Sequence, residues 1–187
     1  KYENDSTIAW RTVVIHWPFF SIGSGHQDSG SMKTNLLADM VKYNVDVVLS
    51  GHDHVMEYIV MDKNTFQQEG VQDQSSDIWH CHRYGINAGL GMSVTFKQGE
   101  QLHQLVAGNG GDDTAHLCNS YITNNENVVF AQSVFGFTEV QITEDEYRLR
   151  FWDIASQTYK SEVIIEPNQE QQLIEDSSQG FLLQSSQ

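Results

Sequence analysis

Hydrophobic and polar positions follow different periods along this chain, and each period predicts a different element. Thr12–Ile15 and Val45–Leu49 are short apolar runs, rich in β-branched residues, that are typical of buried strands. Between them, apolar residues recur with the spacing of one helical face, at Met32, Leu36, Leu37, Met40 and Val41. A strand, a helix and a second strand form a βαβ unit, so we expect two parallel strands joined by a right-handed crossover.

Most of the remaining chain predicts strands. Tyr58–Met61 and Gln104–Ala107 are short apolar runs, and the second leads into a glycine-rich turn. Apolar and polar side chains alternate along Phe137–Ile142 and Tyr147–Trp152, on either side of a polar turn, which predicts a β-hairpin. Another strand is expected at Glu162–Ile165, so the chain combines a βαβ unit with further strands and belongs to the α/β class.

Three segments lack a regular pattern. Residues 62 to 76 are polar and rich in glutamine, like an exposed loop, and residues 78 to 103 mix aromatics, histidine and glycine without a clear period. After Pro167 the chain is rich in Gln, Ser and Glu, and we expect residues 167–187 to form a polar surface tail. In a chain of 187 residues, the expected organisation is one domain over residues 1–166.

Charge and composition exclude several classes of function. The chain has 10 Lys and Arg against 25 Asp and Glu, a formal net charge of −15. This excludes a sequence-independent nucleic-acid binder and a polybasic membrane-surface module, because both need clustered positive charge. The longest apolar runs are far shorter than a membrane span, and a hydrophobic content of 39% is typical of a folded globular domain.

The cysteines and one sequon bear on the compartment. Cys81 and Cys118 allow at most one disulfide and no cysteine-based zinc site. Two alternatives remain: the two cysteines form a disulfide, or both are free buried thiols. A bridge would suit an oxidising compartment. Asn4-Asp5-Ser6 is a glycosylation sequon, which favours a secreted protein with a glycan on Asn4.

Histidines follow both strands of the predicted βαβ unit at the point where each strand ends. His16 comes directly after the first strand, and Gly51-His52-Asp53-His54 follows the second. The carboxyl ends of neighbouring parallel strands lie under about 5 Å apart, so the three imidazoles can converge on one crevice. Imidazole is a common ligand of zinc, iron and copper, and these residues therefore predict a metal site. Four other histidines have no such context and are expected to be ordinary polar loop residues: His80, His82, His103 and His116.

Three segments, in this order and spacing, resemble the second half of a calcineurin-like metallophosphoesterase. They are Val14-Ile15-His16-Trp17-Pro18, Val47-Val48-Leu49-Ser50-Gly51-His52-Asp53-His54 and Ala107-Gly108-Asn109-Gly110-Gly111. The chain looks most similar to purple acid phosphatases of the tartrate-resistant type. The resemblance covers about Trp10–Met61 and about Leu105–Ile165, and residues 62–103 look like an insertion relative to that family. It implies a four-layer α/β/β/α sandwich with mixed sheets, of which this chain would form the second half.

The resemblance also implies a dinuclear metal centre, an iron(III) ion paired with divalent iron, zinc or manganese. His16 matches the histidine of the family's His-x-Pro motif and His52 the first histidine of its Gly-His-x-His box, both ligands of the divalent metal. His54 matches the second histidine of that box, a ligand of the iron(III). Paired cations polarise phosphoryl oxygens and generate a hydroxide for in-line attack on phosphorus.

Further residues of the resemblance have supporting roles. His26 lies in the loop where the family places a histidine that contacts the phosphate or protonates the leaving alcohol, and an ordinary exposed loop residue is the alternative. Asp53 and Asn109 are expected either to orient the metal-ligating side chains by hydrogen bonds or to lie on the substrate side of the site. For Asp53 a turn carboxylate is the competing interpretation.

The function implied is that of an acid phosphatase for phosphate monoesters in a secreted or lysosomal compartment. Two alternatives remain open: another metallophosphoesterase acting on nucleotides or phosphodiesters, or a phosphatase fold kept as a non-catalytic interaction module. The family's other ligands come from three earlier motifs, Gly-Asp-x-Gly, Gly-Asp-x-x-Tyr and Gly-Asn-His-Asp/Glu, and none of them occurs here. We therefore expect a missing N-terminal half as partner and expect this chain alone to be inactive.

Overall fold

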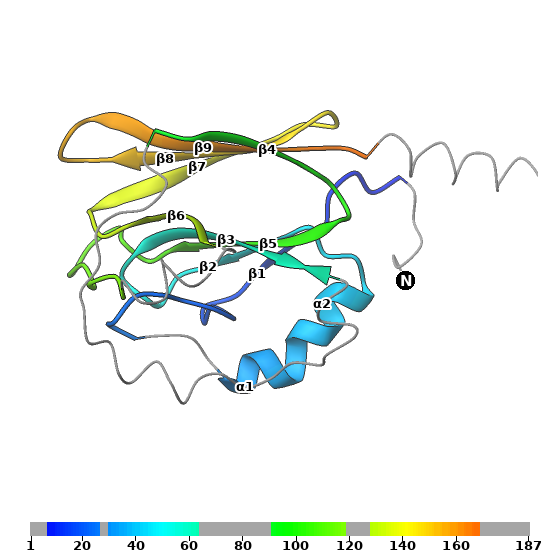
Figure 1. Ribbon diagram of the computed structural model, residues 1–187, viewed down its shortest axis with the longest axis horizontal. Helices are drawn as coiled ribbons and strands as arrows, with labels where there is room; N and C mark the ends of the chain where they lie inside the picture. Colours follow the sequence, from blue (N-terminus) through cyan, green and yellow to red (C-terminus); the bar gives the residue numbers. More distant parts are fainter. Residues whose placement is uncertain (1–6, 27–29, 64–90, 119–127, 169–187) are drawn as a thin grey trace, which may run out of the picture.

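The computed structural model describes residues 7–26, 30–63, 91–118 and 128–168, and these form two stacked β-sheets with one helical segment (Figure 1). The first sheet has five strands in the order β1-β2-β5-β3-β6. Their bounds are Thr12–Val14 for β1, Val47–Ser50 for β2, Met56–Asp62 for β3, Gln101–Ala107 for β5 and Val128–Gln132 for β6. Strands β1, β2 and β5 are parallel, whereas β3 runs antiparallel to both β5 and β6.

The second sheet has four strands in the order β4-β9-β8-β7. They span Ser93–Lys97 for β4, Gly136–Ile142 for β7, Tyr147–Asp153 for β8 and Thr158–Glu166 for β9. Strand β8 pairs antiparallel with β7 and with β9, as the alternating pattern predicted, while β4 pairs parallel with β9. The hairpin prediction is therefore confirmed, and the strand expected at Glu162–Ile165 is the second half of β9.

One helical segment connects β1 to β2. It consists of α1 (Gly30–Met32), a π-helical turn η1 (Lys33–Leu37) and α2 (Ala38–Lys42), without a break between them. Figure 1 places this segment on the face of the five-stranded sheet that is opposite the second sheet. The predicted strand, helix and parallel strand are confirmed by the register of β1 on β2, in which Val14 pairs with Leu49.

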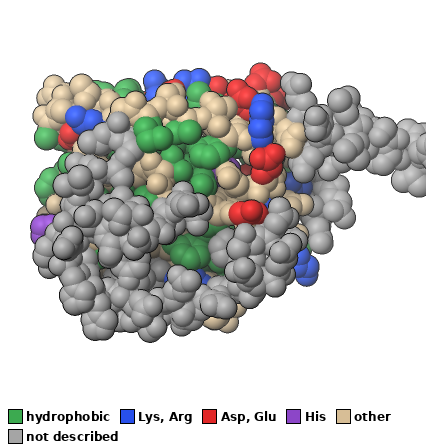
Figure 2. Space-filling view, in the orientation of Figure 1, with side chains coloured by type: hydrophobic (Ala, Val, Ile, Leu, Met, Phe, Trp, Pro, Cys, Tyr) green, Lys and Arg blue, Asp and Glu red, His purple; other side chains and the backbone are tan. Residues whose placement is uncertain are grey.

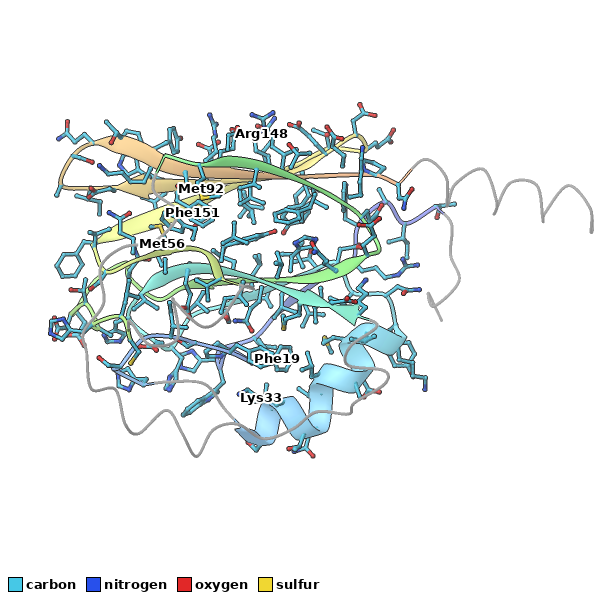
Figure 3. The ribbon with its side chains drawn as sticks, in the orientation of Figure 1. Phe19, Lys33, Met56, Met92, Arg148 and Phe151 are labelled. Atoms are coloured by element: carbon cyan, nitrogen blue, oxygen red, sulfur yellow. The ribbon has the colours of Figure 1, made fainter. Side chains whose placement is uncertain are left out.

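Two apolar layers hold these elements together. Between the sheets, one core cluster joins buried residues of both, and Phe130 of β6 stacks on Phe151 of β8 at a ring-centroid distance of 4.4 Å. A second cluster packs Phe19 and Leu37 against the helix-facing side of the five-stranded sheet. Figure 3 labels Met56 and Phe151 in the layer between the sheets, and Phe19 and Lys33 in the layer on the helix side. Arg148 lies outside both layers, on the upper sheet.

The described residues thus form three layers, helix, sheet and sheet, and are mostly β. Both mixed sheets and one helical layer of the expected α/β/β/α arrangement are present, and a fourth layer is not formed by the residues described here. Strands β3 and β5 are buried on both faces, because the helix covers one side and the second sheet the other. Hydrophobic side chains nevertheless reach the surface between the two sheets (Figure 2).

Several predictions fall wholly or partly outside the described residues, including most of the loop at 62–76, Cys81, Asn4 and most of the tail at 167–187. Within the proposed insertion at 62–103, residues 93–97 form β4 and residues 101–103 begin β5, so its last part contributes to both sheets. Cys118 is disulfide-bonded, which selects one of the two alternatives that the sequence left open. No helix in the described ranges is long and apolar enough to cross a membrane.

His103 is the clearest correction, because it is not an ordinary polar loop residue. It lies on β5 with its side chain 1% exposed, and its Nδ1 is 2.6 Å from the hydroxyl of Tyr58. Its Nε2 has no hydrogen-bond partner among the described residues. Burial, and to a smaller extent the positive charge of Lys63, lowers the pKa of His103 to about 3.

This buried imidazole predicts a loss of stability in mild acid. Below pH 6.5 the unfolded chain gains a proton at His103 that the folded chain does not gain until about pH 3, so stability falls as the pH falls through this window. At pH 5 the loss is about 2 kcal/mol. His103→Asn keeps an acceptor for Tyr58 but cannot titrate, so its free energy of unfolding should depend less on pH.

Urea unfolding at pH 7.5 and pH 5 measures this difference. The wild-type protein should lose about 2 kcal/mol more than His103→Asn between the two values. His116→Asn, at an exposed histidine, is the matched control and should behave like the wild type. Equal losses in all three proteins would contradict a neutral, buried His103.

Candidate metal and phosphate site

The site lies at the carboxyl ends of β1 and β2. The two strands are in parallel register, and two backbone hydrogen bonds extend their pairing: Ile15 donates to the Leu49 carbonyl at 3.0 Å, and Gly51 donates to the His16 carbonyl at 3.2 Å. The chain therefore leaves both strands at the same edge of the sheet. His16 on one strand end and the histidine box on the other become neighbours for this reason.

Four imidazoles meet at this edge, and we refer to His16, His26, His52 and His54 as the histidine cluster. Nδ1 of His52 lies 3.1 Å from Nε2 of His16. The ring of His26 lies 4.9 Å from that of His52 and 4.8 Å from that of His54, measured between centroids. The structure thus brings together all four histidines singled out from the sequence, including His26 from the loop after β1.

The geometry of His52 is unusual in two respects. Its backbone φ is +66°, in the left-handed region that residues other than glycine adopt rarely. Its pKa is lowered, first by partial burial and then by the neighbouring imidazoles of His26 and His16, so the neutral form with a free lone pair is favoured. Strained backbone of this kind is concentrated at functional sites.

The glycine of the box does not make the turn before the two histidines. The φ of Gly51 is not in the left-handed region, and a Cβ at this position would meet no atom within 4 Å. The turn is made at His52 itself. Gly51 is therefore not required sterically in this structure.

Asp53 lies beneath the histidine cluster and binds the loop that carries His26. Its carboxylate is fully buried and accepts hydrogen bonds from the Ser21 hydroxyl at 2.6 Å and from the His26 backbone N–H at 3.3 Å. The Ser21 hydroxyl in turn accepts from the N–H of Gly23 at 3.1 Å. Asp53 thus fixes the His26 loop against the box that carries His52 and His54.

Asn109 occupies a different place from the histidines. It is fully buried, and its Nδ2 donates to the Val134 carbonyl at 2.8 Å, while its backbone carbonyl accepts from the N–H of Gly136 at 3.1 Å. Its Oδ1 has no hydrogen-bond partner among the described residues. Asn109 joins the glycine-rich turn after β5 to the start of β7, and its predicted role toward a ligand stays a prediction.

The sequence did not single out three other residues that shape this site. Trp17 lies over the His52 ring at a centroid distance of 3.6 Å, and Ser21 binds Asp53 as described. The buried amide of Gln104 accepts from the N–H groups of Phe19 and Phe20 at 2.9 and 3.2 Å. Gln104 lies in the buried strand β5 and holds this loop through these hydrogen bonds.

His16 and His52 are spaced like two ligands of one metal ion. Two nitrogens that each bind an ion at about 2.0–2.1 Å lie about 3.0–3.4 Å apart. The observed 3.1 Å falls in this range and is also the length of the N–H···N hydrogen bond that joins the two rings in this structure. In the described part of the chain, no group of three or more His, Cys, Asp or Glu side chains is arranged to hold a metal. The Asp53 carboxylate next to the cluster is directed at Ser21 and His26 instead. The donors present therefore fit part of a metal site.

Comparison with known proteins supports the fold. No protein-family model matches the sequence, and no curated protein sequence matches it. The structure is similar to purple acid phosphatase PPD1 from yellow lupin (Lupinus luteus) seeds, with a TM-score of 0.58 and 16% identity over 85% of this chain and 25% of that protein. It is also similar to GAP50, the anchor in the inner membrane complex of Plasmodium, with a TM-score of 0.50 and 17% identity over 80% of this chain and 34% of GAP50.

These likenesses identify the class of fold. The chain matches part of the metallophosphoesterase fold. At 16% and 17% identity, the likeness extends to the fold alone. It spans about a quarter of the length of PPD1 and a third of GAP50. The histidine cluster lies at the edge of the sheet where open α/β sheets bind ligands.

The contact between Gly23 and Asp53 gives a direct test of this loop. A Cβ at Gly23 would lie 2.6 Å from Cγ of the Asp53 carboxyl, which is buried and hydrogen-bonded and so cannot move freely. Gly23→Ala should destabilise the protein by about 1–3 kcal/mol. Gly51→Ala, which meets no atom, is the matched control and should stay within about 0.5 kcal/mol of the wild type in urea unfolding. Two variants of equal stability would show that Asp53 does not fix the loop.

Proposed function

We propose that this chain is the C-terminal half of an acid phosphatase that hydrolyses phosphate monoesters at a dinuclear metal centre. The observation that carries the proposal is the pair His16 Nε2 and His52 Nδ1, 3.1 Å apart at the ends of two parallel strands. The likeness of the fold to a purple acid phosphatase supports it. An iron(III) ion with divalent iron, zinc or manganese is the centre that this class of fold suggests.

In this proposal the four histidines have different roles. His16 and His52 hold the divalent ion, and His54 holds the iron(III) ion. The ions, when bound, polarise the phosphoryl oxygens and activate the attacking water. His26, exposed and held at the edge of the cluster by Asp53, gives a proton to the leaving alcohol. Asp53 acts through this loop, because its carboxylate is directed at Ser21 and His26 rather than at an ion.

A further polypeptide segment is proposed to complete the sheet and the site. Val13 and Ile15 pack on the helix side of β1, so Val14 faces the second sheet, where it is 76% exposed. On β7, Ile142 pairs with the buried Tyr147 and points to the same interior, yet it is 52% exposed. Apolar side chains that face the interior and remain exposed favour a missing neighbour beside β1 and β7. That neighbour would also supply the carboxylate ligands that the described residues lack.

A non-catalytic module is the second candidate function. The likeness to GAP50, which is described as an anchor, favours it. So does the finding that no group of three or more His, Cys, Asp or Glu side chains among the described residues is arranged to hold a metal. In that case the histidine cluster would be retained without turnover. Metal affinity separates the two candidates, because an anchor has no need of it.

A secreted or lysosomal location is proposed with the phosphatase function. The disulfide at Cys118 supports it, because such bonds persist in oxidising compartments. The formal net charge of −15 keeps such a protein negatively charged at mildly acidic pH.

Intact mass, metal content and hydrolysis of 4-nitrophenyl phosphate by the native protein test the proposal together. An accompanying upstream segment, about two metal ions per complex and hydrolysis are expected. His16→Ala and His52→Ala should each weaken Zn(II) binding, measured by calorimetry, by at least about 100-fold. His116→Ala, at an exposed histidine that is not one of the four of the histidine cluster, is the control and should bind as the wild type does.

Each outcome selects a function. Zn(II) binding that depends on His16 and His52 together with hydrolysis supports the phosphatase. A native protein that holds no metal, does not bind Zn(II) and does not hydrolyse the ester would contradict it and leave the anchoring function.

A further inference from the structure

Lys63 is a buried lysine at the end of the five-stranded sheet that is opposite the histidine cluster. It follows β3 directly, it is 6% exposed, and its Nζ has no hydrogen-bond partner among the described residues. Burial lowers the pKa of Lys63, because it disfavours the charged ammonium form, although the charge of Asp46 opposes this. An ammonium group carries three donors, and leaving them unpaired in the interior is unfavourable. Lys63 therefore needs an acceptor.

His103 supplies a second unpaired donor. Its ring is neutral, its Nδ1 lies 2.6 Å from the hydroxyl of the fully buried Tyr58, and its Nε2 has no partner within the described ranges. Because no other described residue accepts from the Tyr58 hydroxyl, this hydroxyl donates to Nδ1. The hydrogen of the neutral imidazole is then on Nε2. His103 thus presents a buried N–H group without an acceptor.

Strand register brings the two donors to the same end of the sheet. Asp62, the last residue of β3, pairs with Gln101, two residues before His103 on β5, and Lys63 comes next along the chain. The backbone N–H of His103 donates to the carbonyl of Asp46 at 3.0 Å, just before β2. The positive charge of Lys63 acts on the Asp46 carboxylate and on the His103 ring. Lys63, His103 and Asp46 therefore form one buried polar group.

The carboxylate in this group does not satisfy Lys63. Asp46 is 3% exposed, and it accepts from the backbone N–H of Arg11 at 2.8 Å and from the side chain of Gln98. Lys63 and Arg11 bring two positive charges to the single negative charge of Asp46. The group thus combines unpaired donors with more positive than negative charge. A bound anion would balance both, whereas a buried water molecule would balance only the hydrogen bonds.

We propose that Lys63 Nζ and the Nε2–H of His103 bind a small inorganic anion of the chloride type. The anion accepts a hydrogen bond from each donor and neutralises the ammonium charge. The site lies at the far end of the strands from the histidine cluster, so it is independent of the proposed phosphatase function. Its effect is on the stability of the fold, because the unfolded chain does not hold the two donors together.

Unfolding of the native protein by urea over a range of NaCl concentrations tests the proposal, with sodium gluconate keeping the ionic strength constant. One anion bound to the folded chain alone should raise the folding equilibrium constant about tenfold for each tenfold rise in chloride above its Kd. Lys63→Met keeps the length of the side chain without its donors or charge. It should remain folded and lose the dependence on chloride.

A second buried lysine gives the matched control. Lys33 lies in the helical segment, is 1% exposed, and its Nζ is 4.5 Å from the centroid of the Phe20 ring. Lys33→Met removes a buried lysine from the other apolar layer and should keep the full dependence on chloride. In crystals grown with NaBr, anomalous scattering from bromide should locate the ion between Lys63 and His103.

Each result decides the proposal. A dependence on chloride that is lost in Lys63→Met and kept in Lys33→Met supports it. A folding equilibrium constant that does not change with chloride overturns it, and a water molecule or an acceptor from the chain then satisfies Lys63. A dependence that persists in Lys63→Met, or bromide found only elsewhere, also overturns it. The proposed phosphatase function is unaffected by any of these results.

Discussion

The parallel pairing of β1 with β2 is the interaction on which the candidate site depends. The register that sets Val14 opposite Leu49 ends both strands at one edge, and His16 and His52 follow directly. No long-range contact between side chains is needed to bring them together, because the backbone ladder does so. The separation of 3.1 Å between their nitrogens is then a consequence of strand register and of the left-handed turn at His52.

The buried polar groups serve two different purposes. Asp53 is satisfied by Ser21 and His26 and organises the loop beside the histidines. His103 is only half satisfied, by Tyr58, and remains neutral because burial disfavours its charged form. In the proposed acidic compartment this lowers the stability of the fold, because protonation of the His103 imidazole then favours the unfolded chain. The disulfide at Cys118 is a stabilising cross-link that would offset part of such a loss.

The sequence predicted those parts of the fold that depend on local pattern. The βαβ unit and the β7–β8 hairpin have clear hydrophobic periods. Because the strand ends could be placed from these periods, the histidines that follow them could be singled out as well. Strand β4 was missed because its partner β9 lies more than 60 residues away, and its own pattern is not apolar enough to stand out. His103 was misjudged because burial of a lone polar residue depends on Tyr58 and Phe96, on two other strands. Trp17 and Ser21 gained their contacts only through tertiary packing.

The exposed apolar side chains and the proposed metal site lie at the same edge of the molecule. Strand β1 lies at one edge of its sheet and β7 at one edge of the other. Trp10, two residues before β1, packs on Tyr147 of β8, next to β7. Val14 and Ile142 are exposed along this side, and His16 follows β1 by two residues. A neighbour pairing with β1 would cover these apolar side chains, and its strand ends would lie beside His16 at the histidine cluster. Under the proposed function, one additional segment would therefore supply both the packing for these side chains and further metal ligands.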